Sequence, residues 1–92
     1  MWSLRLTAAA QREFSRLPSA RLSEEAGDLI EDLVEDPFPA GYLKMRRYSD
    51  HYRIRFGGDR YRIVHRVNLR QHLITILRIR PRSSAYRGMR DS

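Results

Sequence analysis

The hydrophobic periodicity of this 92-residue chain changes at residues 36–41, and that change constrains its fold more than any other feature. The segment reads Asp-Pro-Phe-Pro-Ala-Gly, and prolines and glycines end helices and favour turns. Apolar residues before it recur at the spacing of an amphipathic helix. Apolar residues after it alternate with polar ones, which is the period of a half-buried strand. The chain is therefore expected to be helical first and β-rich afterwards.

The first part predicts a short strand followed by two helices. Residues 2–6 alternate apolar and polar side chains, which is typical of a strand. Thr7 is placed to cap a helix over residues 8–17, and Ser19 is placed to cap a second helix that continues to residue 35. We expect these helices to form a hairpin with an acidic outer face. The acids expected on that face are Glu13, Glu24, Glu25, Asp28, Glu31, Asp32 and Glu35.

The second part predicts four strands, at residues 42–46, 51–56, 60–67 and 72–79. Glycines at 57 and 58 predict a tight turn, and Pro81 is expected to interrupt the chain after the last strand. That strand is apolar on both faces, which indicates an inner position in a sheet. The order predicts one α+β domain over residues 1–92. Its helical hairpin covers one face of a mainly antiparallel sheet of four to five strands.

Charge is divided between the two parts of the chain. Residues 42–90 contain fourteen Lys or Arg and two acids, a net charge of +12, whereas the remaining residues carry −5. Alternation in the third and fourth strands places Arg53, Arg55 and Arg62 on the sheet face away from the helices. A basic, ordered face of this kind predicts binding to phosphate, and most simply to nucleic acid.

Several functional classes are excluded or disfavoured by composition. The chain has no cysteine, so it has no disulfide scaffold and no thiol nucleophile. Structural roles are expected for His51, His65 and His72, because their spacing does not suit a metal site; no metal and no cofactor are expected. Its apolar runs are far shorter than the ~20 residues that span a bilayer, and no signal peptide is evident. A cytoplasmic protein that does not bind membranes is expected.

The chain resembles the RelE/ParE superfamily of toxins from type II toxin–antitoxin systems over nearly its full length. The matching pieces, in chain order, are Leu17-Pro18, Leu33-Val34-Glu35-Asp36-Pro37, Tyr52-Arg53-Ile54-Arg55-Phe56-Gly57, Tyr61-Arg62-Ile63-Val64, Arg82 and Tyr86-Arg87. Each piece is short, and their order and spacing carry the resemblance. It implies a RelE-like fold similar to the compact microbial ribonucleases and, for the RelE branch, cleavage of mRNA in the ribosomal A site.

The resemblance also implies roles for particular residues. The catalytic basic residues of the family fall on Arg53 and Arg55, its phosphate-contacting arginine on Arg62, and its C-terminal catalytic pair on Arg82 and Tyr86. Further cations are expected to bind RNA or phosphate. They are Lys44, Arg46, Arg60, Arg80 and Arg87.

The expected chemistry is internal attack on a phosphate by the 2′-hydroxyl of RNA. Arg62 and Arg82 suit neutralisation of the phosphate, since a guanidinium group matches phosphate oxygens. Tyr86 suits the general base, although a free tyrosine has a pKa of about 10 and needs neighbouring cations to favour its phenolate. Many members of the family have Gly-His-Arg where this chain has Arg80-Pro81-Arg82, so one acid/base group is missing.

Two other functions remain open at this stage. A ParE-like toxin would poison DNA gyrase with the same fold, and a degenerate member would bind nucleic acid without cleaving it. The resemblance implies three kinds of partner: the ribosome with its mRNA, a cognate antitoxin, and promoter DNA reached only through the antitoxin complex. The antitoxin is expected to contribute an acidic, amphipathic segment, because it must neutralise part of the basic region and cover apolar groups.

Overall fold

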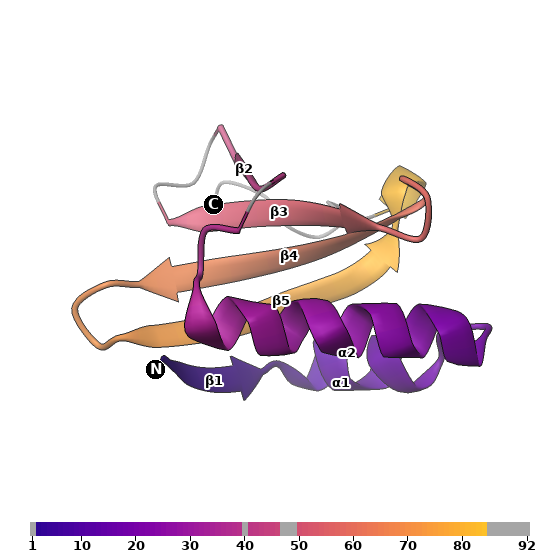
Figure 1. Ribbon diagram of the computed structural model, residues 1–92, viewed down its shortest axis with the longest axis horizontal. Helices are drawn as coiled ribbons and strands as arrows, with labels where there is room; N and C mark the ends of the chain where they lie inside the picture. Colours follow the sequence, from indigo (N-terminus) through magenta and orange to yellow (C-terminus); the bar gives the residue numbers. More distant parts are fainter. Residues whose placement is uncertain (1, 40, 47–49, 85–92) are drawn as a thin grey trace.

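The computed structural model describes residues 2–39, 41–46 and 50–84 and contains two α-helices and five strands in these ranges (Figure 1). In chain order the elements are β1 (Ser3–Leu6), α1 (Ala8–Ser15), α2 (Ala20–Glu35), β2 (Leu43–Lys44), β3 (His51–Phe56), β4 (Tyr61–Asn68), β5 (Leu73–Pro81) and the 3-10 helix η1 (Arg82–Ser84). The expected α+β fold is confirmed. Among the described residues, no helix is long and apolar enough to cross a membrane.

One five-stranded sheet forms the body of the molecule, with the strands in the order β1-β5-β4-β3-β2. Strand β1 pairs with β5 in parallel, and the other pairs are antiparallel. The last strand, β5, therefore lies inside the sheet, as its apolar sequence predicts. The parallel pair brings the N-terminus of the chain next to β5, so that the first and last strands support each other.

Both helices lie on the same face of the sheet (Figure 1). Small and branched side chains of the helices pack there against alternating residues of the strands, which satisfies the two hydrophobic periodicities at once. The buried core consists of Ala10, Ala26, Ile30, Leu33, Ile54, Phe56, Ile63, Ile74, Ile76 and Ile79. The opposite face of the sheet has no described α-helix over it, and this is the face on which the arginines of β3 and β4 are expected.

Hydroxyl groups begin both helices, as the sequence predicts. Thr7 Oγ1 accepts a hydrogen bond from the backbone N–H of Ala10 at 3.0 Å, and Ser19 Oγ accepts one from Leu22 at 3.2 Å. The Thr7 hydroxyl also donates to the carbonyl oxygen of Leu77 at 2.8 Å. The start of α1 is thereby attached to β5 as well as capped.

Strands β2 and β5 differ most from their expected bounds. Strands β1 and β4 differ by one residue at their ends, and helix α1 ends at residue 15 instead of 17. Strand β2 covers only residues 43 and 44 of the expected 42–46, although the Met45 N–H still donates to the carbonyl oxygen of His51 at 2.9 Å.

Strand β5 includes Pro81, which the sequence was expected to place beyond the strand, and Pro81 pairs with Tyr61 at the end of β4. The next residue, Arg82, donates its N–H to the carbonyl oxygen of Arg60 at 2.7 Å, so Tyr61 and Pro81 form a non-hydrogen-bonded pair. A proline is tolerated there because its nitrogen points away from β4, toward the edge that β1 does not reach. The pairing also passes from Val64–Arg78 to His65–Ile76, so that Leu77 is an extra, bulged residue.

A glycine turn joins β3 and β4. Gly57, Gly58 and Asp59 all have positive φ, at 64°, 63° and 76°. Gly57 is also close to its neighbours, since a Cβ atom added there would lie 2.8 Å from Cδ2 of Leu22. The Glu25 carboxylate of α2 accepts a hydrogen bond from the Gly57 N–H at 3.1 Å. Helix α2 therefore holds this turn directly.

Glu13 differs from the expected solvated acid of the helix surface. Its carboxylate accepts hydrogen bonds from the Ile79 N–H at 2.8 Å and from Arg78 Nη2 at 2.9 Å, and it pairs with Arg80 Nε at 3.2 Å. Since β1 pairs only with the first half of β5, the N–H of Ile79 lacks a strand partner on that side. Glu13 supplies the missing acceptor and fixes α1 against β5.

His65 is fully buried on the helix side of the sheet, in agreement with its expected structural role. Its Nε2 lies 3.1 Å from the carbonyl oxygen of Pro37, to which it donates as a neutral ring, and its ring stacks on Tyr52. Burial lowers the pKa of His65 from its ordinary value of 6.5, and the hydrogen bond to Pro37 opposes that shift in part. The folded state therefore resists protonation of this ring.

The free energy of unfolding is expected to fall as the pH drops below about 6.5. In that range the unfolded chain protonates His65 while the folded state, with its lowered pKa, does not. Urea unfolding at pH 7.5 and 5.0 measures the loss. His65→Gln keeps a donor for Pro37 but does not titrate, so the variant is expected to lose less stability than the wild type between the two pH values. An equal loss in both proteins would contradict this account.

Candidate nucleic-acid interface

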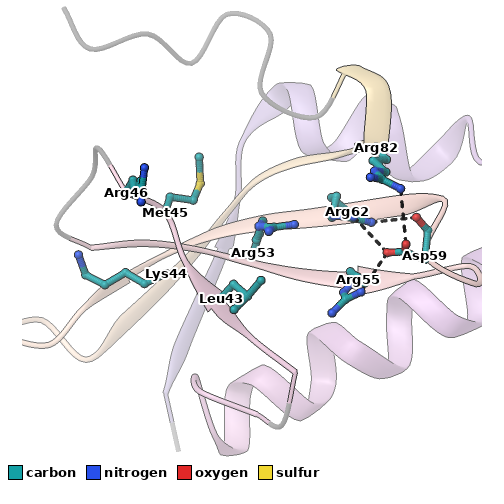
Figure 2. A pocket seen from close by; sticks show the side chains of 9 residues that line it. All are labelled: Leu43, Lys44, Met45, Arg46, Arg53, Arg55, Asp59, Arg62 and Arg82. Carbon is teal, nitrogen blue, oxygen red and sulfur yellow. Dashed lines mark hydrogen bonds and ion pairs between the residues drawn. The ribbon is translucent and has the colours of Figure 1, made fainter.

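A basic hollow of about 730 Å³ lies on the sheet face away from the helices. Figure 2 shows that its lining side chains come from β3, β4, the segment around β2, the β3–β4 turn and the start of η1, and that Arg55, Arg62 and Arg82 gather around Asp59. The residues that line it are Leu43, Lys44, Met45, Arg46, Arg53, Arg55, Asp59, Arg62 and Arg82. Six of the nine are cations, and these six are all among the residues that the sequence predicted for catalysis or RNA binding.

Strand register brings the central arginines together. Arg53 and Arg55 share one face of β3 because side chains alternate along a strand. Arg55 is the direct partner of Arg62 across the β3–β4 pair. The expected convergence of these three side chains is therefore confirmed, although their roles in catalysis stay predictions. Like charges directly opposite each other in a sheet repel, so this arrangement needs a compensating anion.

Asp59 supplies that anion from the β3–β4 turn. Its carboxylate lies 3.1 Å from Arg62 Nη2, 3.4 Å from Arg55 Nη1 and 3.6 Å from Arg82 Nη1 (Figure 2). Partial desolvation raises the pKa of Asp59, but the charges of Arg62, Arg55 and Arg82 outweigh it and hold the pKa below its ordinary value of 3.8. The carboxylate is therefore ionised at neutral pH.

Arg62 is the rigid member of the cluster, with only 4% of its surface exposed. Its Nη1 donates to the carbonyl oxygens of Asp59 at 3.0 Å and of Tyr61 at 3.1 Å, in addition to the ion pair with the Asp59 side chain. Its buried Nε has no hydrogen-bond partner among the described residues. The guanidinium plane is thus fixed by the turn that it lies beside, which suits a group that must hold a phosphate in one position.

The rim of the hollow is less constrained. The side chains of Arg55 and Arg82 are 54% and 69% exposed, so they can move toward a bound ligand. Leu43 and Met45 add apolar surface next to Arg46, and Leu43 is placed by its pairing with Arg53. A polyanion with flat bases needs this combination of cations and apolar surface.

The remaining predicted site residues lie elsewhere or outside the described residues. Arg60 lines a second hollow, of about 430 Å³, on the other side of the turn. Arg80 is paired with Arg62 in register, but its side chain forms an ion pair with Glu13 at the edge of β5. Tyr86 and Arg87 lie outside the described residues, so their predicted roles remain predictions.

Asp59 is the site residue that sequence reasoning missed as a member of the cluster. The available signal was that it is the only acid between Arg53 and Arg78 and follows two glycines. Aspartate tolerates positive φ better than most residues, so a turn was the simpler interpretation of its position. Its three ion pairs depend on the strand register and became evident only in three dimensions.

Comparison with known proteins adds independent information about the chain. A family model described as the ParE toxin of the type II toxin–antitoxin system parDE matches residues 4–86. No curated protein sequence gives a significant match.

Solved structures resemble the whole fold. The isolated RelE toxin from E. coli matches with a TM-score of 0.77 at 20% identity, over 88% of this chain and 84% of that chain. The archaeal RelE–RelB complex from Pyrococcus horikoshii matches with a TM-score of 0.76 at 24% identity, over 91% and 98%. The RelBE2 toxin–antitoxin complex from Mycobacterium tuberculosis matches with a TM-score of 0.72 at 25% identity, over 88% and 98%.

Arg62→Gln is expected to lower the free energy of unfolding by about 2 kcal/mol, because it removes charge-assisted hydrogen bonds from a buried position. Arg55→Gln is the matched control, since it removes the same charge from the exposed side of the same cross-strand pair. It is expected to change stability by less than about 0.5 kcal/mol. Urea unfolding of the two variants measures the difference, and equal effects would show that Arg62 is not the structural anchor of the cluster.

Proposed function

The chain belongs to the ParE toxin family of type II toxin–antitoxin systems, within the RelE/ParE superfamily, and from this premise we propose that it is an endoribonuclease that cleaves mRNA on the ribosome. The observation that carries the proposal is the convergence of Arg53, Arg55, Arg62 and Arg82 on one hollow (Figure 2). Inhibition of translation follows from the loss of the message.

The proposed reaction is attack of the RNA 2′-hydroxyl on the adjacent phosphate, with departure of the 5′-oxygen. The phosphate gains negative charge as the attacking oxygen bonds to it. Arg62 is held rigidly at the floor of the hollow and Arg82 is exposed at its rim, so the two arginines are suited to neutralise that charge from two sides. Arg53 and Arg55 bind the flanking backbone in this scheme, and Lys44 and Arg46 extend the basic surface around β2.

Proton transfer is assigned to Tyr86 in the proposal, on the basis of the family resemblance. Tyr86 follows η1, whose first residue, Arg82, reaches the hollow. A guanidinium group close to a tyrosine favours its phenolate, which is the form that accepts the proton of the 2′-hydroxyl. Pro81 stands where many relatives have histidine, so the proton for the 5′-oxygen is expected to come from the ribosome or the RNA.

Poisoning of DNA gyrase is the second candidate function. It is favoured by one observation, namely that the family model that matches residues 4–86 is that of the ParE toxin. The fold is common to both branches, so fold similarity does not separate them. The arginine cluster favours the nuclease, because cleavage needs several cations at one phosphate.

An antitoxin is the proposed partner of this chain. The similar protein from M. tuberculosis was solved as a toxin–antitoxin complex, and the one from P. horikoshii as a RelE–RelB complex. Leu43, with 43% of its surface exposed, lies beside the cations of the hollow, so a segment with both acids and apolar side chains fits this face. Promoter DNA is expected to bind the complex through the antitoxin.

Arg82→Ala and Tyr86→Phe are each expected to lower mRNA cleavage by about 10²-fold or more, because each removes a group from the transition state. Primer extension on a defined mRNA in a cell-free translation reaction measures the cuts. Arg70→Ala removes one exposed arginine from the β4–β5 turn and is expected to cleave like the wild type. Intact mRNA with the folded wild type, together with trapped gyrase–DNA cleavage complexes in a parallel assay, would instead identify a gyrase poison.

A complex with the antitoxin is expected to form at micromolar concentration or below and to weaken as salt rises from about 50 to 200 mM, because charge pairing contributes to it. Isothermal titration calorimetry at the two salt concentrations measures this. Arg53→Ala is expected to weaken binding more than Arg70→Ala. No complex at micromolar concentration would refute the pairing.

A further inference from the structure

The arginine cluster of the hollow already contains an anion of its own. Among the described residues that line the hollow, Asp59 is the sole acid. Its carboxylate forms ion pairs with Arg55 from β3, Arg62 from β4 and Arg82 from η1. No other residue drawn in Figure 2 is joined to all three arginines. Two carboxylate oxygens satisfy guanidinium groups in the same way as two phosphate oxygens do.

We propose that Asp59 is an internal counter-anion that positions these three arginines in the free protein and is exchanged for an RNA phosphate when substrate binds. This inference rests on the proposed function, since it concerns the same hollow and the same class of ligand. Asp59 is a positioning residue in this account. It acts on the substrate through the arginines that it holds and releases.

The three contacts of Asp59 differ in distance and burial, and this difference determines which arginines leave the carboxylate when a phosphate binds. Arg62 is buried and is also held by two backbone carbonyl oxygens, so it keeps its place when the carboxylate leaves. Arg55 and Arg82 are more than half exposed, and their distances to the carboxylate, 3.4 Å and 3.6 Å, are longer. A phosphate above Arg62 would therefore attract the two exposed arginines away from Asp59, while Arg62 remains as the fixed point.

A purely structural role in the turn does not require the charge. The backbone of Asp59 has a φ of 76°, which asparagine and glycine also adopt readily. A role as general base fits poorly as well, because the surrounding arginines hold the pKa of Asp59 below its ordinary value and make the carboxylate a weaker base. What the carboxylate offers at this position is a negative charge beside three cations.

Asp59→Asn tests the proposal, because it removes the charge and keeps the shape and the tolerance of positive φ. The matched control is Asp50→Asn, which causes the same change in net charge. Asp50 is the other acid of the basic segment, and it binds Arg66 and His51 outside the hollow. The probe is a short single-stranded RNA with 2′-O-methyl groups, which cannot be cleaved by internal attack. Fluorescence anisotropy at several salt concentrations measures its affinity.

The Asp59→Asn protein is expected to bind the probe about three- to tenfold tighter than the wild type, whereas the Asp50→Asn protein is expected to gain less than about twofold. Asp59→Gly removes the carboxylate in a residue that also accepts positive φ, and it is expected to change affinity in the same direction. Thermal unfolding monitored by circular dichroism identifies any variant that fails to fold. If Asp59→Asn fails, the comparison is made with Asp59→Gly.

A change at Asp59 that equals the change at Asp50 would overturn the proposal, because net charge alone would then explain it. Weaker binding of the folded Asp59 variants would overturn it too, since the carboxylate would only support the arginines. Where mRNA is cleaved, Asp59→Asn is expected to lower both KM and kcat, as substrate binds more tightly to less ordered arginines. The affinity for the uncleavable probe is measured whether or not the protein cleaves RNA. Failure of the nuclease proposal is therefore recognised separately, as uncut mRNA with the wild-type protein.

Discussion

The repulsion between Arg55 and Arg62, which face each other across β3 and β4, is the constraint around which the structure is arranged. It is offset by a carboxylate in the turn that joins the same two strands. That turn needs three consecutive residues with positive φ, and helix α2 fixes it through the hydrogen bond from Gly57 to Glu25. The core that packs α2 against the sheet therefore also determines where the arginines lie. This turn therefore connects the packing of the core on one face of the sheet to the positions of the arginines on the other face.

Most of the fold was predictable because its local and long-range preferences agree. Alternation in β3 determined which side chains face the helices, and the glycine pair determined where the chain reverses. The departures have specific causes. Pro81 joins β5 because, as the last residue of that strand, it pairs with Tyr61, the first residue of β4. Leu77 is a bulge that no periodicity reveals. Glu13 packs against β5 because the short β1 pairs only with the first half of that strand. The N–H of Ile79 is then left for the Glu13 carboxylate.

The site was predictable in part, for a similar reason. A single strand pattern suffices to place Arg53 and Arg55 on one face, but the contribution of Asp59 depends on the register between two strands. Arg80 shows the opposite case. Its position opposite Arg62 suits the hollow, yet its side chain reaches Glu13, because an ion pair at the half-buried edge competes with the exposed face. Side chains of this length are placed by their partners as much as by the backbone.

The separation of charge between the two layers gives the molecule an electric dipole across its thickness. Helix α2 exposes Glu24, Asp28, Glu31, Asp32 and Glu35 on one side, and the basic hollow opens on the other. The shortest dimension of the molecule is 25 Å, whereas electrostatic fields in physiological salt decay over about 8 Å. A diffusing polyanion therefore experiences each layer almost independently, and it is repelled or captured according to the side that it meets. The net charge of +7 therefore predicts neither the repulsion by the acidic side nor the attraction by the basic side.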